Sequence, residues 1–188
     1  MRSLGSTFER LLETVVPLRA RSKRVKDLSV VNIPLTPREH SLLGSHITTL
    51  MDYTDGAVED LVRSLKYDGS GYAAHLCASL LSDYLREEFA TQKLYSQKEI
   101  FIVPVPLHTS RYRERGFNQI GLVLDRLPVE FRDGTLSTLV PEALTRVRQT
   151  RPQTKLPRYE RLSNVAGAFE LPDPEMFGNS VVFLLDDV

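Results

Sequence analysis

The sequence VVFLLDDV at residues 181–188 places five consecutive apolar residues directly before Asp186 and Asp187. A continuous apolar run of this kind predicts a strand over 181–187 that is buried on both faces. Neighbouring strand residues point to opposite faces, so both aspartates can address one ligand only where the strand turns. The stretch therefore predicts a sheet strand that brings carboxylates to a pocket, with a plain surface turn as the alternative.

A second run, IFIVPV at residues 100–105, indicates another buried parallel strand. Pro104 and Pro106 cannot donate hydrogen bonds to a sheet, so we expect the strand to end there. A loop rich in arginine follows, and we expect Gly116 to open a helix. Guanidinium groups beside the free N–H groups of a helix start suit phosphate or pyrophosphate, although a charged helix start without a ligand is equally compatible.

Hydrophobic periodicity supplies the remaining elements of the prediction. We expect helices over 8–15, 58–65, 73–88 and 116–127, and strands over 47–53, 139–146 and 165–171. Residues 18–26 are predicted to be a solvated basic connection, with a nucleic-acid patch as the alternative reading, and residues 147–160 an exposed loop. Strands that alternate with helices predict an α/β fold with a parallel sheet.

The composition, with 41% hydrophobic and 26% charged residues over 188 positions, is that of an ordinary soluble globular protein. The formal net charge is 0, but residues 144–161 hold six basic residues and one acid, and residues 162–188 hold five acids and no Lys or Arg. A basic loop beside an acidic strand end suits a ligand that combines anionic groups with hydroxyls or a metal. From composition alone, a solvated loop is the favoured alternative, and a mobile flap that closes over an anion is the functional one.

The single cysteine, Cys77, excludes a disulfide within the chain and a zinc site built from several cysteines. Cys77 falls on the apolar face of the predicted helix 73–88, so we expect it to pack rather than react. No stretch approaches the roughly 18 apolar residues that span a bilayer. Glu9 and Glu13 interrupt the first apolar segment, which argues against a signal peptide, and we expect a cytoplasmic protein.

An apolar strand that ends in acids is also typical of the magnesium-holding acid of nucleotide hydrolases. That interpretation needs a Gly-Lys-containing phosphate loop, and the chain contains no Gly-Lys pair.

Taken together and in this order, these stretches resemble the ComF family of the type I phosphoribosyltransferase superfamily, which is associated with competence for DNA uptake. The similarity covers about residues 45–188. The matching segments are residues 65–67 with Gly69, residues 103–108, residues 115–119, spaced positions from Leu144 to Phe169, and residues 181–188, which look like the front half of the superfamily's phosphoribosyl pyrophosphate motif.

The resemblance implies a type I phosphoribosyltransferase-like fold, in which helices flank a central, mostly parallel sheet beneath a small N-terminal hood. It implies an N-terminal segment over 1–44 and a phosphoribosyltransferase-like domain over 45–188. Family members carry a zinc ribbon after the first helix, but that region reads PLRARSKRV here, so we expect no zinc. The superfamily motif continues past its acids into Thr and Gly residues, so we expect the chain to be truncated inside this motif.

The implied function is a glycosyltransferase reaction of nucleoside metabolism, in which phosphoribosyl pyrophosphate and Mg²⁺ bind and the phosphoribosyl group passes to an unknown nitrogen acceptor. Mg²⁺ is expected to be held through the substrate and water rather than by protein side chains. The alternative is a ligand-sensing component of competence and DNA uptake without turnover, with single-stranded DNA or competence proteins as partners.

Carried onto this chain, the resemblance assigns Arg146 and Arg148 to catalysis, by neutralising the pyrophosphate that leaves. It assigns Asp186 and Asp187 to the ribose hydroxyls. The other substrate-binding positions, of which Gln119 and Asn164 are equally suited to bracing the site, are Leu107, His108, Arg111, Arg115, Gln119, Gln153, Arg161 and Asn164.

Overall fold

The computed structural model describes residues 20–187 apart from residues 43, 152, 154 and 155. The chain forms two compact units, Met1–Ala73 and Ala74–Val188, and the division falls inside helix α4 (Gly71–Tyr95). The helix predicted over 8–15 lies outside the described residues.

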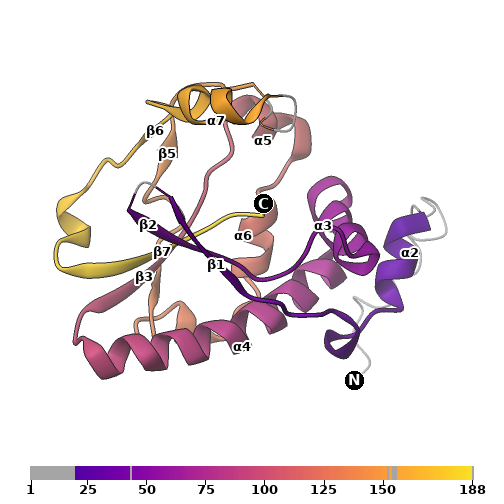
Figure 1. Ribbon diagram of the computed structural model, residues 1–188, viewed down its shortest axis with the longest axis horizontal. Coiled ribbons are helices and arrows are strands. Elements are labelled where there is room, and N and C mark those ends of the chain that lie inside the picture. The colour runs from indigo at the N-terminus through magenta and orange to yellow at the C-terminus, as the bar shows by residue number, and fades with distance from the viewer. Residues whose placement is uncertain (1–19, 43, 152, 154–155, 188) are drawn as a thin grey trace, which may run out of the picture. The chain divides into compact units, whose positions relative to one another are not determined.

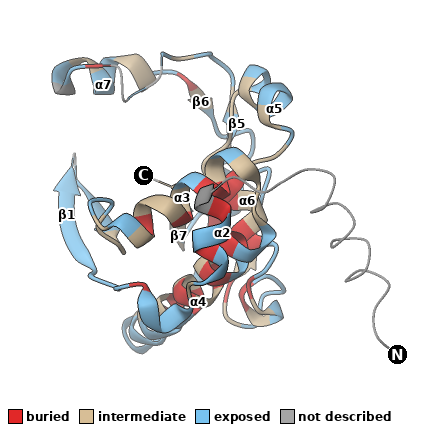
Figure 2. Ribbon diagram, turned by 90° about the vertical axis from the view of Figure 1, so that its right-hand side faces the viewer, coloured by how far each residue is buried: buried red, intermediate tan, exposed pale blue. Residues whose placement is uncertain are grey.

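In the residues that the structure describes, the first unit contains two helices and a hairpin. Its elements are α2 (Ala20–Lys26), a 3-10 turn η1 (Val30–Asn32), the antiparallel strands β1 (Arg38–Leu42) and β2 (Ser45–Thr49), and α3 (Gly56–Asp68). The strand predicted over 47–53 is therefore displaced toward the N-terminus, and the boundary expected after residue 44 falls in the turn of the hairpin. The hairpin strands are exposed along almost their whole length (Figure 2).

Helix α3 confirms the helix predicted over 58–65 and shows why it forms. The carboxylate of Asp55 accepts hydrogen bonds from Ala57 N at 2.8 Å and Val58 N at 3.2 Å, which caps the helix start. Gly69, in the left-handed conformation with φ of 59°, ends the helix.

Helix α2 corrects the prediction that residues 18–26 form a solvated connection. Ser22 and Val25, three residues apart, share a buried face of this helix. Ser22 Oγ donates to Asp68 Oδ2 of α3 at 2.7 Å and lies 3.0 Å from Ser64 Oγ. This buried face includes so few residues that no apolar periodicity can be recognised among the basic residues of the sequence.

The second unit holds a parallel sheet with strand order β4-β3-β7. Its elements are β3 (Glu99–Pro104), α5 (Thr109–Arg115), α6 (Gln119–Leu124), η2 (Val129–Phe131), β4 (Thr138–Leu139), β5 (Thr145–Arg146), α7 (Arg158–Val165), β6 (Phe169–Glu170), η4 (Glu175–Phe177) and β7 (Ser180–Leu185) (Figure 1). Three parallel strands with helices around them bear out the α/β prediction.

Strand β3 lies at the centre of the sheet, as its continuous apolar sequence predicts. It pairs with β7 from Glu99↔Ser180 to Pro104↔Leu185 and with β4 at Phe101↔Thr138. One further bond, from Val105 N to Leu185 O at 2.8 Å, extends the ladder past Pro104. The carboxyl ends of all three strands therefore open on the same edge.

Both faces of the sheet are packed by aromatic side chains. Phe89 of α4 meets Phe183 of β7 edge-on, with ring centroids 4.8 Å apart. On the other face, Phe101 of β3 meets Phe177 of η4 at 5.0 Å. Such edge-to-face pairs add about 1 kcal/mol each beyond the area that they bury.

Strand β7 differs from the prediction in length and in burial. It ends at Leu185, so both aspartates lie beyond the strand. Val182 and Leu184 are 45% and 56% exposed, because β7 is the edge strand of the described sheet and one of its faces is only partly covered. A continuous apolar run could not reveal this difference between the two faces.

Several other predicted bounds are corrected by the structure. Helix α4 continues past residue 88 to Tyr95, and the helix expected over 116–127 is confined to α6. The strand expected over 139–146 is two short strands, β4 and β5, separated by a turn around Pro141. The strand expected over 165–171 is only β6, since α7 extends to Val165.

None of the helices in the described part of the chain has the length and apolar character needed to cross a membrane.

Candidate functional site

The carboxyl edge of the parallel sheet is where the sequence places the candidate site, and three chain segments leave it. The loop 105–108 follows β3, residues 140–144 follow β4, and Asp186 and Asp187 follow β7. Ligands of open parallel sheets bind at this edge, because the loops there are free to vary while the strands stay fixed. Leu107 is half-buried in the first of these loops.

The loop after β3 turns into helix α5, where the sequence predicted an irregular stretch. His108 caps this helix, since its Nδ1 accepts a hydrogen bond from Ser110 N at 3.2 Å and lies 2.8 Å from Ser110 Oγ. An Nδ1 that accepts from a backbone N–H leaves the ring proton of the neutral imidazole on Nε2.

Gly116 ends α5 rather than opening the next helix, which corrects the prediction made for it. Its φ is 80°, and its N–H donates to Tyr112 O at 2.7 Å. This left-handed turn is open to glycine without strain. The role expected for free N–H groups at Gly116 is thereby excluded.

The side chain of Asn118 connects the start of helix α6 to the end of strand β3. Its Oδ1 accepts from Ile120 N at 3.0 Å and so caps α6, while its Nδ2 donates to Val105 O at 3.2 Å. One side chain thus fixes the start of α6 against the end of β3.

Arg115 and Gln119, both predicted to bind substrate, contact each other. Arg115 Nη1 donates to Gln119 Oε1 at 3.0 Å, and Gln119 is only 3% exposed. A side chain buried to this extent braces α6 rather than facing a ligand.

We call residues 145–170 the arm. It consists of β5 and β6, which pair antiparallel, and of α7 between them; α5 and α7 lie at the same end of the second unit in both views (Figures 1 and 2). The exposed loop expected over 147–160 therefore overlaps helix α7, which begins at Arg158.

Arg146 occupies the base of the arm, on β5. Its guanidinium lies over the ring of Phe169, 5.2 Å from the centroid, and Phe169 is its partner in the β5–β6 register. Its Nη2 also donates to Thr150 Oγ1. Its Nε is buried and makes no hydrogen bond to any residue that the structure describes.

Other charged side chains surround this guanidinium. Burial lowers the pKa of Arg146, and the nearby positive charge of Arg111 lowers it as well, whereas Asp186 raises it and Arg148 lowers it again. Arg111 on α5, Asp186 after β7 and Arg146 on the arm are therefore close enough to interact electrostatically. Segments far apart in the sequence converge here.

Arg148 is engaged differently from Arg146. Its Nη2 donates to Asn164 O at 3.0 Å and to Ala166 O at 2.6 Å, the carbonyls at the end of α7. A cation at a helix C-terminus compensates the partial negative charge of these groups. Arg148 thus links the end of α7 to the segment that follows β5, and it adds positive charge near Arg146.

The remaining predicted residues of the arm form a hydrogen-bond network with one another. Asn164 Nδ2 donates to Arg151 O at 2.9 Å, and its Oδ1 accepts from Arg151 N at 3.2 Å. Gln153 Nε2 donates to Arg161 O at 3.4 Å, and Arg161 Nε donates to Leu156 O at 3.3 Å. These three side chains brace the arm.

Asp186 and Asp187 follow the strand in a segment without regular secondary structure, in which Asp187 N donates to Asp186 Oδ1 at 2.8 Å. Asp186 is exposed and Asp187 is half-buried.

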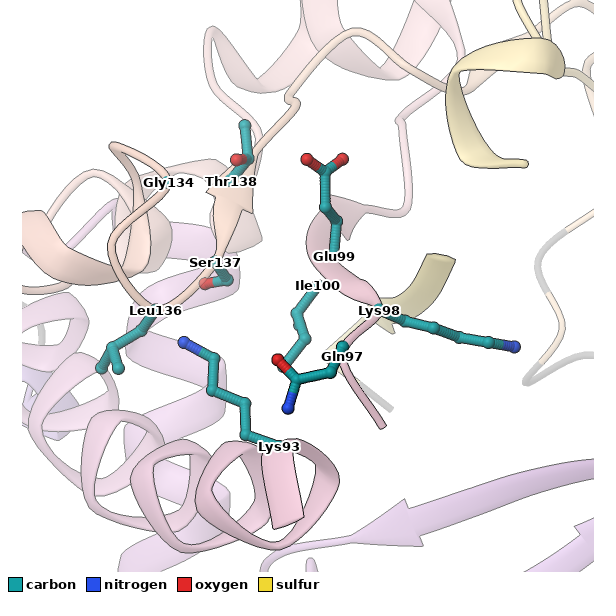
Figure 3. A pocket seen from close by; sticks show the side chains of 9 residues that line it. All are labelled: Lys93, Gln97, Lys98, Glu99, Ile100, Gly134, Leu136, Ser137 and Thr138. Carbon is teal, nitrogen blue, oxygen red and sulfur yellow. The ribbon is translucent and has the colours of Figure 1, made fainter. Parts of the chain in front are cut away.

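A hollow of about 250 Å³ lies at the opposite, amino end of β3 and β4 (Figure 3). Lys93, which points toward Ser137, donates to Thr135 O at 3.2 Å, while Lys98 points away from the hollow (Figure 3). This hollow is separate from the charged cluster at the carboxyl edge.

Among the residues that the structure describes, no group of three or more His, Cys, Asp and Glu side chains is placed to hold a metal ion. The oxygen atoms of Asp186 and Asp187 are the donors at the carboxyl edge that suit Mg²⁺.

Three residues near the cluster were not predicted as site residues: Asn118, Thr150 and Phe169. Asn118 carries a sequence signal, because Asn directly before an apolar helical stretch is a preferred N-cap. Thr150 and Phe169 are among the spaced positions that carry the family resemblance, but the resemblance gave them no role, and their contacts with Arg146 follow from the folded arm.

Comparisons with protein-family models, with curated proteins and with solved structures found no match for this chain.

Proposed function

We propose that the carboxyl edge of the sheet binds phosphoribosyl pyrophosphate together with Mg²⁺. The observation that carries the proposal is the position of Arg146, partly buried and near the positive charges of Arg111 and Arg148. Partial burial beside like charges is costly for a guanidinium, and a bound anion removes that cost. A pyrophosphate group, which bears several negative charges, suits such a cluster.

Asp186 supports the choice of a sugar diphosphate over a simple anion. A carboxylate beside an anion site repels the anion, so its presence there favours a ligand that also carries hydroxyl donors or a bound cation. The ribose hydroxyls and Mg²⁺ of a phosphoribosyl pyrophosphate complex supply both. Bound Mg²⁺ would neutralise charge on the pyrophosphate and would be held through the substrate and water, with the negative charges of Asp186 and Asp187 nearby.

The reaction that we propose is transfer of the phosphoribosyl group to a nitrogen nucleophile. The bond between the anomeric carbon and the pyrophosphate oxygen breaks, a carbon–nitrogen bond forms, and the nitrogen releases a proton to solvent. Arg146 and Arg111 would stabilise the charge that develops on pyrophosphate, so catalysis rests on positioning and electrostatics. The acceptor is a nitrogen compound that the cluster itself does not specify.

Isothermal titration calorimetry with phosphoribosyl pyrophosphate tests this proposal. In the presence of Mg²⁺ we expect micromolar binding, which Asp186→Asn and Arg146→Ala each weaken at least tenfold. Arg151→Ala is the matched control, because Arg151 is an arm arginine whose guanidinium pairs with Glu160 at 3.1 Å. Absence of binding by the unaltered protein, or equal loss in the control, would contradict the proposal.

One observation favours a second candidate, the binding of single-stranded DNA. Tyr159 on α7 is 80% exposed, and an exposed aromatic ring beside arginines is a stacking platform for a base. In this case an oligothymidylate binds with a steep dependence on salt, Tyr159→Ala weakens it, and phosphoribosyl pyrophosphate does not compete.

A further inference from the structure

Phe169 lies beneath the one guanidinium on which the proposed site depends. It is the cross-strand partner of Arg146 in the β5–β6 pairing, and its ring centroid is 5.2 Å from the guanidinium carbon. Side chains opposite each other on paired strands share a face of the ribbon, so the backbone itself sets this contact. Phe169 is half-buried, which leaves the guanidinium over a ring that is partly shielded from water.

Without the ring, the other contacts of Arg146 would not fix the position of its guanidinium. Its Nη2 donates to Thr150 Oγ1, and its Nε has no hydrogen-bond partner among the described residues. An arginine side chain has about 2 kcal/mol of rotamer entropy to lose when it is fixed in one geometry. A single hydroxyl acceptor fixes the position of one nitrogen atom, whereas contact with a ring face also fixes the plane of the guanidinium.

The neighbouring charges also oppose the observed position. Arg111 and Arg148 repel the guanidinium, whereas Asp186 attracts it. A favourable interaction with the aromatic face, which is stronger where water is excluded, offsets part of that repulsion.

We propose that Phe169 is a positioning residue, which holds the guanidinium of Arg146 in a fixed plane so that it meets the pyrophosphate group without reorganisation. This inference rests on the proposed function, since it concerns the same anion site. Phe169 itself does not touch the ligand and acts through Arg146 alone.

The first test needs no ligand and uses the side-chain N–H signal of Arg146 in nitrogen-15 NMR spectra. In the unaltered protein we expect slow exchange of the Nε proton with water, because this nitrogen is buried. Phe169→Leu, which keeps an apolar side chain but removes the ring, should speed this exchange about tenfold, and Phe169→Tyr should leave it unchanged. Equal exchange in all three proteins overturns the positioning role.

The second test is a double-mutant cycle on the affinity for phosphoribosyl pyrophosphate with Mg²⁺. We expect Phe169→Leu to weaken binding about fivefold to tenfold, in line with a partly desolvated cation–π contact. The same substitution should have no further effect in an Arg146→Ala background, and Phe169→Tyr should restore affinity to within about twofold of the unaltered protein. A general structural role for Phe169 predicts instead an equal loss in both backgrounds, and that result overturns the inference.

The two proposals fail in different ways. If the unaltered protein does not bind phosphoribosyl pyrophosphate, the proposed function is wrong and so is the ligand-directed part of the inference, while the exchange measurement still decides whether the ring fixes Arg146. If the unaltered protein binds and the cycle shows no coupling, only the inference is wrong.

Discussion

Asn118 connects strand β3 to helix α6 through both ends of one amide. Its oxygen caps the helix at Ile120 N, and its nitrogen reaches Val105 O, the carbonyl one residue past the end of the strand. A cap and a tertiary hydrogen bond each contribute about 1 kcal/mol.

We therefore expect Asn118→Ala to lower the free energy of unfolding by about 1–2 kcal/mol in urea denaturation. Asn118→Asp keeps the capping oxygen and loses only the donor to Val105 O, so it should cost about half as much. A loss equal to that of the alanine variant would show that the cap contributes nothing.

Cys77 gives a second prediction at the scale of one residue. Cys77 is half-buried by its exposed surface, and the protein atoms around its thiol raise the pKa of that group to about 12 from an ordinary value of 9.0 by desolvation. The thiolate is the reactive form, so at pH 8 we expect negligible labelling by a disulfide reagent in the folded protein and rapid labelling in urea. Rapid labelling of the folded protein at pH 8 would contradict this packing.

The same pKa shift sets the sign of a pH effect on stability. Because the folded-state pKa is the higher one, the stabilising effect of the neutral thiol is complete below pH 9.0 and is lost as the pH rises toward about 12. The free energy of unfolding should therefore fall more steeply above pH 9.0 in the unaltered protein than in Cys77→Ala. Parallel pH profiles would show that the thiol is not responsible.

At the scale of elements, the arm is held together by its own side chains. Arg148 binds the carbonyls of Asn164 and Ala166, and the amide of Asn164 binds both backbone groups of Arg151. These contacts link the two ends of the arm across α7. The arm is thus an ordered element built around few apolar side chains, chiefly Leu156 and Ala168.

We expect Arg148→Met to loosen the arm without disturbing the sheet. Backbone amides at the end of α7, such as that of Ala166, which donates to Leu162 O at 3.1 Å, should exchange hydrogen about fivefold faster, while amides of β3 keep their rates. Arg113→Met, on α5, is the matched control. Equal acceleration in β3 and in the arm would indicate a global loss of stability instead.

The elements divide clearly into those that the sequence could predict and those that it could not. Strand β3 and helix α3 were predicted because each has a regular apolar pattern along its own length. Helix α5 was missed because TSRYRER has no apolar face, and its ends are set by His108 and Gly116. Helix α2 was missed because, among its side chains whose burial is described, only Ser22 and Val25 are buried, which is too few to give a periodic apolar pattern.

At the scale of the molecule, the candidate site depends on contacts between segments that are distant in sequence. The sequence predicted that acids follow one strand and arginines follow another, since both strands are recognisable locally. The sequence alone could not show which structural role each arginine has. Arg146 enters the charged cluster, Arg148 caps α7 and Arg161 braces the arm, and these differences follow from strand pairing and helix placement.

We expect one ligand to bind between the acids after β7 and Arg146 at the base of the arm. A crystal structure of the protein with Mg²⁺ and phosphoribosyl pyrophosphate would show whether it does. We predict ribose hydroxyls within hydrogen-bond distance of Asp186 or Asp187 and pyrophosphate oxygens on the guanidinium of Arg146. Density for the ligand in the hollow beside Lys93, or with its pyrophosphate away from Arg146, would contradict the account.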